Sequence, residues 1–281
     1  MGEYSGRTVV ITGGGSGLGA AMADLFAAEG ARLALLDIDG ERAEARAAEL
    51  RSAGADAFAS RVDVADKASI LSAAQTVKER FGAVHVLCAN VGVQQFGAIE
   101  KLTDEDWEWV MSVNFRGAVH TVDAFLPLLR ADAGPRHIVL TASASFFQFG
   151  ARMAAYVASK FAVVGYGEVL RQELAGEGIN VAMLFPAGMT TRHIESSIAA
   201  RPAELGPSRF DPEDIRAMAA SSDLDTSADL ATAGEAVENL LAELRGGEPY
   251  IITHGSYRQQ VEARQARVID AFRRMEAKRS R

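Results

Sequence analysis

The chain has 281 residues, 48% of them hydrophobic, which is enough to bury a full core without the help of disulfides or metals. Its net charge of −8 argues against non-specific binding of nucleic acid, and no run of about 18 apolar residues predicts a membrane span. The single cysteine, Cys88, excludes an internal disulfide, and the N-terminus shows no basic region followed by an apolar one. A soluble, cytoplasmic protein is therefore expected.

Short apolar runs typical of strands alternate along the chain with longer segments of helical periodicity. We expect strands at 7–12, 31–37, 57–63, 84–90, 136–143, 179–185 and 249–254. We expect helices at 17–29, 40–53, 66–81, 103–131, 151–176 and 229–245. Most of these strands are apolar throughout, which is typical of strands covered on both faces. The alternation predicts an α/β fold: a single doubly wound, Rossmann-type parallel sheet with helices on both faces, forming one domain over residues 1–281.

Residues 188–228 break this alternation. They show no strand pattern and are rich in Pro, Ser, Asp and Ala, and the pair Asp211-Pro212 is typical of a helix start. A segment of this length between sheet elements is usually a lid or a substrate-binding loop. A surface insertion without function is the alternative.

The end of the chain differs in charge from the rest. Residues 258–281 contain eight Arg or Lys and three Asp or Glu, which gives this segment a net charge of +5 and the rest of the chain a net charge of −13. Apolar residues recur there at helical spacing: Val261, Val268, Phe272 and Met275. We expect an amphipathic helix at 256–279 that packs on its own protein, with contact to nucleic acid or an acidic membrane as the alternative.

A glycine-rich turn, TGGGSGLG at residues 12–19, joins the first strand to the first helix. Gly13, Gly17 and Gly19 permit a sharp turn and a close approach of the backbone to a ligand. The helix N-terminus that follows offers unpaired N–H groups to a pyrophosphate. The spacing differs from the Gly-x-Gly-x-x-Gly of the usual fingerprint, but its place after a strand and before a helix still predicts a dinucleotide site.

The second predicted strand ends in a carboxylate, Asp37, 18 residues after Gly19. A carboxylate there can accept hydrogen bonds from both ribose hydroxyls of adenosine and would repel a 2′-phosphate, so NAD is predicted over NADP. A turn-forming role is the alternative, although Asp39 and Gly40 suffice for the turn. Arg32 and Arg42 are the nearby basic residues that could favour NADP.

Several further motifs occur in the order of one family, and over residues 5 to about 190 the chain resembles the short-chain dehydrogenases/reductases. Asp63-Val64 matches the family's adenine-contacting pair. "CANVG" stands where the family usually has Asn-Asn-Ala-Gly, with Asn90 and Gly92 in place and Ala89 and Val91 departing from the pattern. "PAGMTT", residues 186–191, resembles the segment that embraces nicotinamide, with Ala187 in place of glycine.

The same resemblance implies a catalytic tetrad: Asn114, Ser143, Tyr156 and Lys160. Tyr156 follows Ser143 by 13 residues, and the stretch "YVASK" places Tyr156 and Lys160 one turn apart on the same helix face. Such a pair also occurs by chance in many helices. By resemblance, Tyr156 is the acid/base and Ser143 holds the substrate oxygen. Lys160 and the positive nicotinamide would both lower the pKa of Tyr156. Asn114 would hold a local helix irregularity and a water that links Lys160 to solvent.

The expected cofactor is NAD. The resemblance and the glycine turn together give this set of contacts: Gly13, Ser16, Gly17, Leu18, Gly19, Asp37, Ile38, Asp63, Val64, Asn90, Tyr156, Lys160, Pro186, Met189 and Thr191. No metal is expected, because the five histidines (85, 120, 137, 193 and 254) show no metal-ligand spacing.

Aromatic residues after Ser143 predict a roomy, mostly apolar substrate pocket. Phe146, Phe147 and Phe149 follow the serine closely. The expected substrate contacts are Gln94, Phe96, Ser143, Phe147, Phe149 and Tyr156. The segments "YIITHGSYRQQVEAR" and "FGAIEKLTDEDWEWVMSVN" are similar to bacterial members that oxidise bulky aromatic secondary alcohols. Hydroxysteroid dehydrogenation is the close alternative, and a non-catalytic dinucleotide-binding protein is the other.

The resemblance also bears on partners. The long predicted helices at 103–131 and 151–176 should pair with their copies about two-fold axes, giving a homodimer or homotetramer. Neither nucleic acid nor a membrane is an expected partner.

Overall fold

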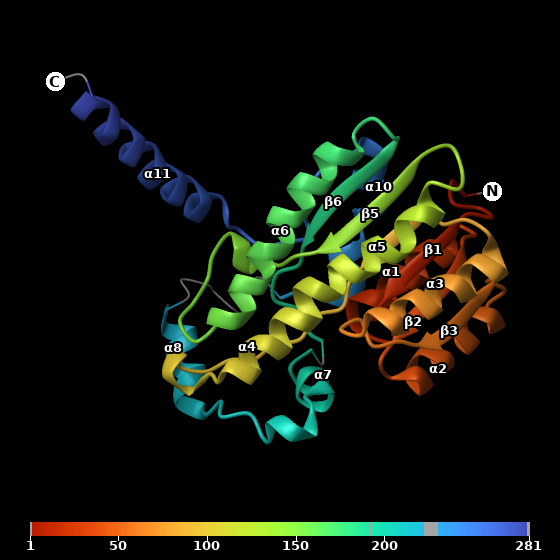
Figure 1. The fold of residues 1–281 in the computed structure, drawn as a ribbon, viewed down its shortest axis with the longest axis horizontal. Coiled ribbons are helices and arrows are strands. Elements are labelled where there is room, and N and C mark those ends of the chain that lie inside the picture. Colours follow the sequence, from red (N-terminus) through yellow and green to blue (C-terminus); the bar gives the residue numbers. More distant parts are fainter. Residues whose placement is uncertain (1, 192, 222–229, 280–281) are drawn as a thin grey trace.

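A parallel sheet forms the centre of the molecule (Figure 1). The computed structural model describes residues 2–191, 193–221 and 230–279. Within them, seven strands pair in the order β3-β2-β1-β4-β5-β6-β7, all in parallel. The strands are β1 (Thr8–Thr12), β2 (Arg32–Asp37), β3 (Ala57–Arg61), β4 (Val86–Ala89), β5 (Arg136–Thr141), β6 (Ile179–Phe185) and β7 (Tyr250–Ile252). The predicted doubly wound, Rossmann-type α/β sheet is confirmed.

Helices follow the strands in the expected alternation. The helices up to β6 are α1 (Gly17–Ala28), α2 (Gly40–Ser52), α3 (Lys67–Phe81), α4 (Asp104–Met111), α5 (Gly117–Leu129) and α6 (Ala154–Leu174). The later ones are α7 (His193–Ala200), α8 (Pro212–Ser221), α9 (Ala233–Val237), α10 (Leu240–Gly246) and α11 (Arg258–Arg279). None of the helices in the described ranges is both long and apolar enough to cross a membrane.

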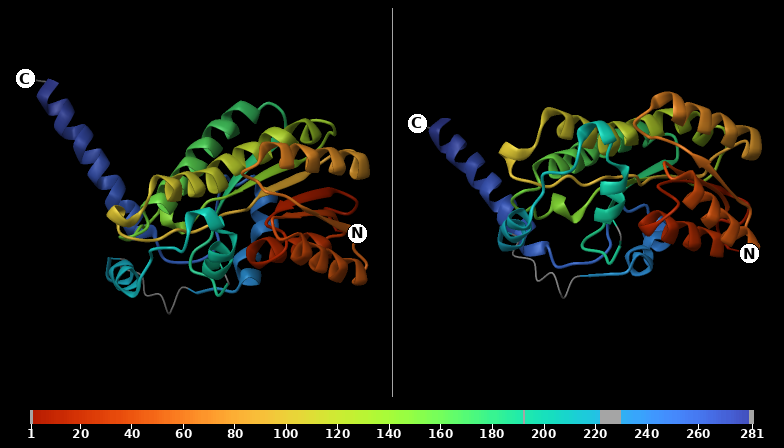
Figure 2. Two further views of the ribbon diagram at one scale, coloured as in Figure 1. Left: turned by 60° about the horizontal axis from the view of Figure 1, so that its bottom comes forward. Right: turned by 90° about the horizontal axis from the view of Figure 1, so that it is seen from below.

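Helices cover both faces of the sheet (Figure 2), and a hydrophobic core lies between the sheet and each layer of helices. One is filled by α3, α5 and α6, and the other by α1, α2 and α10. Because successive side chains of a strand point to opposite faces, Val9 and Ile11 of β1 lie in the second core and Val10 lies in the first. Cys88 is fully buried in the second core, where it serves as a small apolar residue.

The long helix predicted at 103–131 is interrupted. A capping box between Thr103 and Asp106 starts α4, but residues Ser112–Arg116 form a π-helical turn before α5 begins. The cause is Asn114, whose buried amide binds the backbone N–H and C=O of Val93 and draws the turn toward the loop after β4. The predicted helix at 229–245 is likewise two short helices, α9 and α10, in its described part.

Only the first turns of the last helix contact its own protein, whereas the whole segment was predicted to pack there. Tyr257 is stacked on Phe147 with 6.2 Å between ring centres, and this anchor aims α11 away from the body (Figure 1). Val261 and Arg264 contact the body, but no residue of α11 over its described length is buried. The apolar face of the helix is therefore exposed.

Candidate active site

A cleft of 1690 Å³ opens at the carboxyl ends of β1, β4 and β5. It includes the point where the strand order reverses between β1 and β4, which is where open α/β sheets bind their ligands. The glycine turn lines one end, and Ser143 and Tyr156 line the other. The cleft therefore joins the predicted dinucleotide site to the predicted catalytic residues.

The glycine turn has the shape that a bound phosphate needs. Gly13 and Gly17 have φ angles of 69° and 52°, a region that favours glycine. A Cβ on Gly19 would lie 2.0 Å from the carbonyl oxygen of Gly13, so the third glycine permits the turn to close on α1. Ser16 precedes the helix and makes no side-chain cap, which leaves the first amides of α1 to face the cleft.

Asp37 is fixed at the end of the cleft that the glycine turn lines. Its carboxylate accepts hydrogen bonds from the backbone N–H of Gly15, at 3.0 Å, and of Asp39, at 3.1 Å. Burial raises the pKa of Asp37, and these two hydrogen bonds act in the opposite direction. The turn-forming role belongs to Asp39, which caps α2 by accepting from the N–H of Arg42.

Three arginines lie at this end of the cleft, and the sequence had indicated only one of them, Arg42, as a residue near Asp37. Arg42, Arg46 and Arg61 all line the cleft near Asp37. Arg42 lies 3.3 Å from the carboxylate of Asp39, and Arg46 forms ion pairs with Asp24 and Glu49. Arg46 lies four residues after Arg42 on α2, about one helical turn. This spacing could have indicated that Arg46 lies on the same helix face as Arg42.

The other end of the cleft brings together Ser143, Tyr156 and Lys160. Tyr156 and Lys160 project from α6, and both are buried, with 6% and 2% exposure. The Lys160 ammonium donates a 2.9 Å hydrogen bond to the carbonyl of Thr141 at the end of β5. A Cβ on Gly92 would lie 3.0 Å from the same nitrogen, so this glycine leaves room for the lysine.

Burial moves the pKa values of this pair in opposite directions. It lowers the pKa of Lys160 to about 8 and raises the pKa of Tyr156. Hydrogen bonds with the side chains of Ser143 and Gln94 act to lower the Tyr156 pKa, but they do not outweigh desolvation. The protein's own groups therefore favour the protonated form of Tyr156, and the expected lowering of its pKa by Lys160 and the positive nicotinamide together stays a prediction.

Asn114 lies behind the cleft rather than in its wall. Its side-chain nitrogen donates to the carbonyl of Val93 and to the hydroxyl of Ser159, both at 2.9 Å. Ser159 in turn donates to the carbonyl of Tyr156 at 2.7 Å. This chain of hydrogen bonds ties the π-helical turn to the helix that carries Tyr156. Ser159 was missed, although its place three residues after Tyr156 puts it on a neighbouring helix face.

Two expected substrate residues, Phe147 and Phe149, do not line the cleft. Ser143 caps a short 3₁₀ turn, Ala144–Phe146, by accepting from the N–H of Ser145, and this turn leads the chain away. Phe147 packs in the core against Phe185, with 4.7 Å between ring centres. Phe149 is 50% exposed in a separate groove of 540 Å³.

The aromatic wall of the cleft comes from another loop. Phe96 lines the cleft and meets the ring of Tyr156 edge-on, with 6.2 Å between ring centres. Phe210, from the segment before α8, packs on the other side of Phe96 at 5.6 Å. Gln94 also lines the cleft, as expected, whereas Gln95 points toward Ser208 of the α8 segment.

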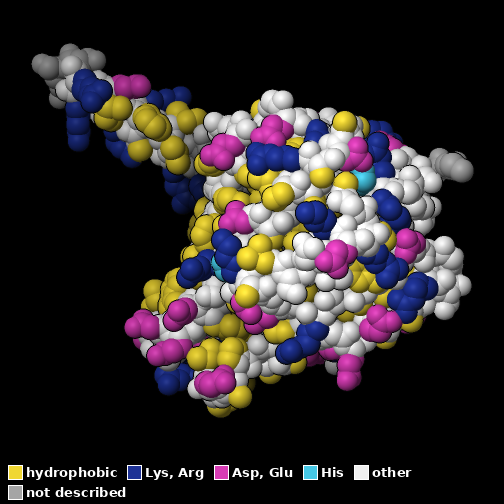
Figure 3. Space-filling model, turned by 45° about the vertical axis from the view of Figure 1, so that its right-hand side comes forward, with side chains coloured by type: hydrophobic (Ala, Val, Ile, Leu, Met, Phe, Trp, Pro, Cys, Tyr) yellow, Lys and Arg dark blue, Asp and Glu magenta, His cyan; other side chains and the backbone are white. Residues whose placement is uncertain are grey.

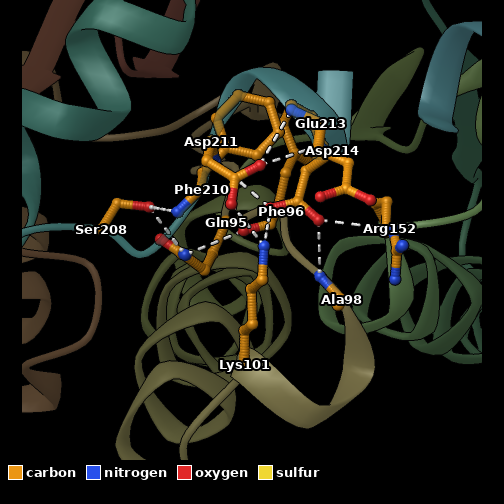
Figure 4. Close-up of polar contacts among 10 residues, drawn as sticks. All are labelled: Gln95, Phe96, Ala98, Lys101, Arg152, Ser208, Phe210, Asp211, Glu213 and Asp214. Atoms are coloured by element: carbon orange, nitrogen blue, oxygen red, sulfur yellow. Dashed lines mark hydrogen bonds and ion pairs between the residues drawn. The ribbon is translucent and has the colours of Figure 1, made fainter. Parts of the chain in front are cut away.

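A cluster of ion pairs fixes α8 to this loop (Figure 4). Asp214 has no exposed surface, accepts from the N–H of Ala98 at 3.2 Å and pairs with Lys101 at 2.9 Å. Arg152 approaches the same carboxylate at 3.3 Å, and Lys101 also reaches Asp211 at 2.6 Å. We call Lys101, Arg152, Asp211 and Asp214 the α8 clamp. Periodicity could not reveal it, because its members lie up to 113 residues apart.

His193, at the start of α7, is a further cleft residue that the sequence did not single out for the site. Burial lowers its pKa to about 4, and the charge of Lys160 acts in the same direction. The side chain is therefore neutral at physiological pH. No group of three His, Cys, Asp or Glu residues that could hold a metal occurs among the described residues.

Comparisons with known proteins agree with this geometry. Residues 7–202 match the family model described as short chain dehydrogenase. The chain is 34% identical over 211 residues to the C alpha-dehydrogenase of Sphingobium sp. (strain NBRC 103272 / SYK-6), which covers 75% of this chain and 69% of that protein. It is 34% identical over 216 residues to the 1-deoxy-11-beta-hydroxypentalenate dehydrogenase of Streptomyces exfoliatus, covering 75% and 78%. A solved short chain dehydrogenase/reductase from Burkholderia phymatum, in complex with NAD, superposes with a TM-score of 0.85 and 32% identity, covering 95% and 96%.

Proposed function

This chain belongs to the short-chain dehydrogenase family, and on that premise we propose that it interconverts a bulky hydrophobic secondary alcohol and its ketone, using NAD. One observation carries the proposal. A single cleft places the Ser143–Tyr156–Lys160 group at one end and the fixed carboxylate of Asp37 at the other. A non-catalytic dinucleotide-binding protein would have no use for the first of these ends.

The residues present fit a nicotinamide dinucleotide. The cradle left by Gly13 and Gly17 lets a pyrophosphate approach the backbone, and α1 directs its free amides there. The cleft-lining residues that would hold the cofactor are Gly13, Ser16, Gly17, Leu18, Asp37, Ile38, Asp63, Val64, Asn90, Lys160, Pro186, Met189 and Thr191. When bound, the oxidised nicotinamide accepts a hydride from the substrate carbon. Gly19 contributes by packing, as its close approach to Gly13 requires.

The chain's own residues handle the proton and the substrate oxygen. Ser143 donates a hydrogen bond to that oxygen and stabilises the charge that develops on it. Tyr156 takes the alcohol proton in oxidation and returns it in reduction. Lys160, whose pKa is lowered to about 8, holds a positive charge next to the phenol and can exchange its own proton near neutral pH. Asn114 positions this group through Ser159.

NAD rather than NADP is proposed on the strength of Asp37. Both oxygens of its carboxylate are held by backbone N–H groups, so the charge cannot turn away from a 2′-phosphate. Two of the three arginines at this end already have acidic partners, Arg42 with Asp39 and Arg46 with Asp24, and Arg61 donates to the backbone carbonyl of Ile38.

The apolar lining of the cleft near Tyr156 supports a bulky, hydrophobic substrate. Apolar side chains from six segments line the cleft: Val93, Phe96, Trp109, Met153, Met189, Ile215, Met218 and Tyr257. Burial of apolar surface contributes roughly 25 cal/mol per Å² removed from water, which a small alcohol cannot exploit. The predicted lid, residues 188–228, carries α7 and α8 in its described part, and this part is proposed to close over such a ligand. Residues 192 and 222–228 lie outside the described residues.

A panel of secondary alcohols with NAD⁺, followed by the absorbance of NADH, tests the proposal. We expect kcat/KM to rise steeply from 2-propanol to aryl carbinols and fused-ring hydroxysteroids, mostly through KM, and the panel also decides between the last two classes. Better turnover of sugars, hydroxy acids or acyl-carrier thioesters would overturn the substrate assignment. Binding of NAD⁺ without turnover of any alcohol would favour the non-catalytic alternative.

By the same resemblance, we propose that α4, α5 and α6 pair with their copies in a homodimer or homotetramer. Light scattering at micromolar concentration tests this, and a monomer would reject it.

A further inference from the structure

Helix α11 carries a stripe of exposed apolar side chains. Val268, Ile269, Phe272 and Met275 are between 39% and 58% exposed, and their spacing places them along one side of the helix. We call α11 the arm and these four residues its stripe. Figure 3 shows apolar and basic side chains together on the arm, which stands away from the body.

The body has an exposed apolar surface of its own at the base of the arm. The groove of 540 Å³ that holds Phe149 is also lined by Ile99 and Phe161. Ile99 is 70% exposed, Phe149 is 50% exposed and Phe161 is 36% exposed. Arg264 of the arm lies over the Phe161 ring, 5.8 Å from its centre. We call this surface the outer groove.

The arm cannot gain much stability by itself. Helices in proteins are stabilised chiefly by packing of an apolar face, and the stripe has no such contact within the described chain. A straight helix of 22 residues is about 33 Å long and points outward, so the stripe does not fold back onto the groove at its own base. Among residues 2–191, 193–221 and 230–279, the stripe and the outer groove therefore do not cover each other.

We propose that the stripe binds the outer groove of a second copy of this chain, so that two copies exchange arms. Charge favours this occupant: residues 258–281 carry +5 and the rest carries −13, so an arm is attracted to the body of another copy. An anionic membrane would attract the arm but repel the acidic body attached to it. Because the groove lies at the base of the arm and is lined by the first turns of α6, one two-fold axis can satisfy both arm contacts together with the α6 pairing proposed above.

This exchange would bring the second copy to the active-site cleft. Gly150 and Met153 line both the outer groove and the cleft. The neighbouring residues hold the lid, since Ala151 donates to Ser221 at 2.7 Å and Arg152 belongs to the α8 clamp. A bound arm therefore borders the cleft mouth. The inference does not depend on the proposed activity and can be tested without it.

Cysteine cross-linking between two differently tagged full-length variants tests the contact. One carries Phe149→Cys in the groove and the other carries Phe272→Cys in the stripe, and both positions are exposed. Oxidation of the mixture should give a disulfide-linked dimer that contains one copy of each. The matched control is Ala266→Cys, which lies on the opposite side of the arm and should cross-link at least about ten-fold less. The native Cys88 is buried and does not interfere.

Equal cross-linking of both arm positions, or none, would overturn the proposal. A second measurement separates the membrane alternative. Co-sedimentation with phosphatidylserine/phosphatidylcholine vesicles should be no stronger for the native chain than for Phe272→Glu. Vesicle binding that Phe272→Glu abolishes would assign the stripe to a membrane surface and overturn the proposal. Since neither readout uses turnover, failure here leaves the proposed function untouched.

Discussion

The ammonium nitrogen of Lys160 lies 5.8 Å from the centre of the Tyr156 ring and bonds to the carbonyl oxygen of Thr141. Desolvation dominates both groups, so the lysine loses its proton more easily than usual and the tyrosine less easily. The chain by itself thus presents a phenol ready to donate a proton to a ketone. Alcohol oxidation needs an additional positive charge near the phenol, which an oxidised nicotinamide would supply.

This relationship predicts opposite pH dependences for the two directions. Oxidation uses the phenolate, whose fraction grows with pH toward the raised pKa of Tyr156, so its kcat/KM should rise with pH. Reduction uses the phenol and should fall over the same range. Rates in both directions between about pH 6 and pH 10 check the sign. Parallel pH profiles would argue against Tyr156 as the acid/base.

Tyr156→Phe should lower turnover by at least ~10²-fold, because it removes the hydroxyl that exchanges the proton. Binding of NAD, measured by calorimetry, should be nearly unchanged. The matched control is Tyr166→Phe, a tyrosine on the same helix that packs edge-on against Phe115. Near-normal turnover of Tyr156→Phe would show that the tetrad assignment is wrong.

Asp37→Asn should shift cofactor preference toward NADP by at least ~10-fold, equivalent to about 1.4 kcal/mol. The change removes the negative charge that opposes a 2′-phosphate while keeping a side-chain oxygen for a backbone N–H. The ratio of kcat/KM for NAD⁺ and NADP⁺ is the measurement. Asp39→Asn, at the cap of α2, is the control and should keep the native ratio. Equal use of both cofactors by the native chain would refute the proposed preference.

Asp214→Asn should loosen the α8 clamp, because Lys101 and Arg152 lose their shared buried counter-charge. We expect a loss of about 1–3 kcal/mol in stability, less than for fully buried pairs since both cations are partly exposed. Displacement of Phe210 and Phe96 should raise KM for bulky alcohols more than it lowers kcat. Steady-state kinetics and thermal unfolding check this. Glu213→Gln, one residue earlier and exposed, is the control. An equal change of KM in this variant would show that the α8 clamp does not cause the effect.

His193→Gln should make the fold less sensitive to acid. The pKa of His193 is about 4 in the folded chain, against an ordinary value of 6.5. Between these two pH values, His193 is protonated in the unfolded chain and neutral in the folded one. Stability present above pH 6.5 is thus lost toward pH 4, by up to about 3 kcal/mol. Urea unfolding at neutral and acidic pH, for the native chain and the variant, measures the difference. Identical pH dependence would contradict the burial of a neutral imidazole.

Local patterns in the sequence predicted the frame of the site. The sheet and its helices follow from periodicity, and the glycine turn and Asp37 follow from their positions at strand ends. Tyr156 and Lys160 share a helix face because four residues make about one turn. Each of these inferences depends on contacts between residues close in sequence, which is why composition and spacing were sufficient.

Only the tertiary structure decided where side chains beyond these elements point. Phe147 and Phe149 follow Ser143 in sequence, yet a 3₁₀ turn sends one into the core and the other to the outer groove. Asn114 breaks a helix that periodicity alone would continue, because its amide satisfies the backbone of Val93, 21 residues away. The carboxylate of Asp214 is buried because cations from two distant loops neutralise it. Such placements are set by long-range packing and by the need to pair buried polar groups. Neither of these produces a periodic pattern in the sequence.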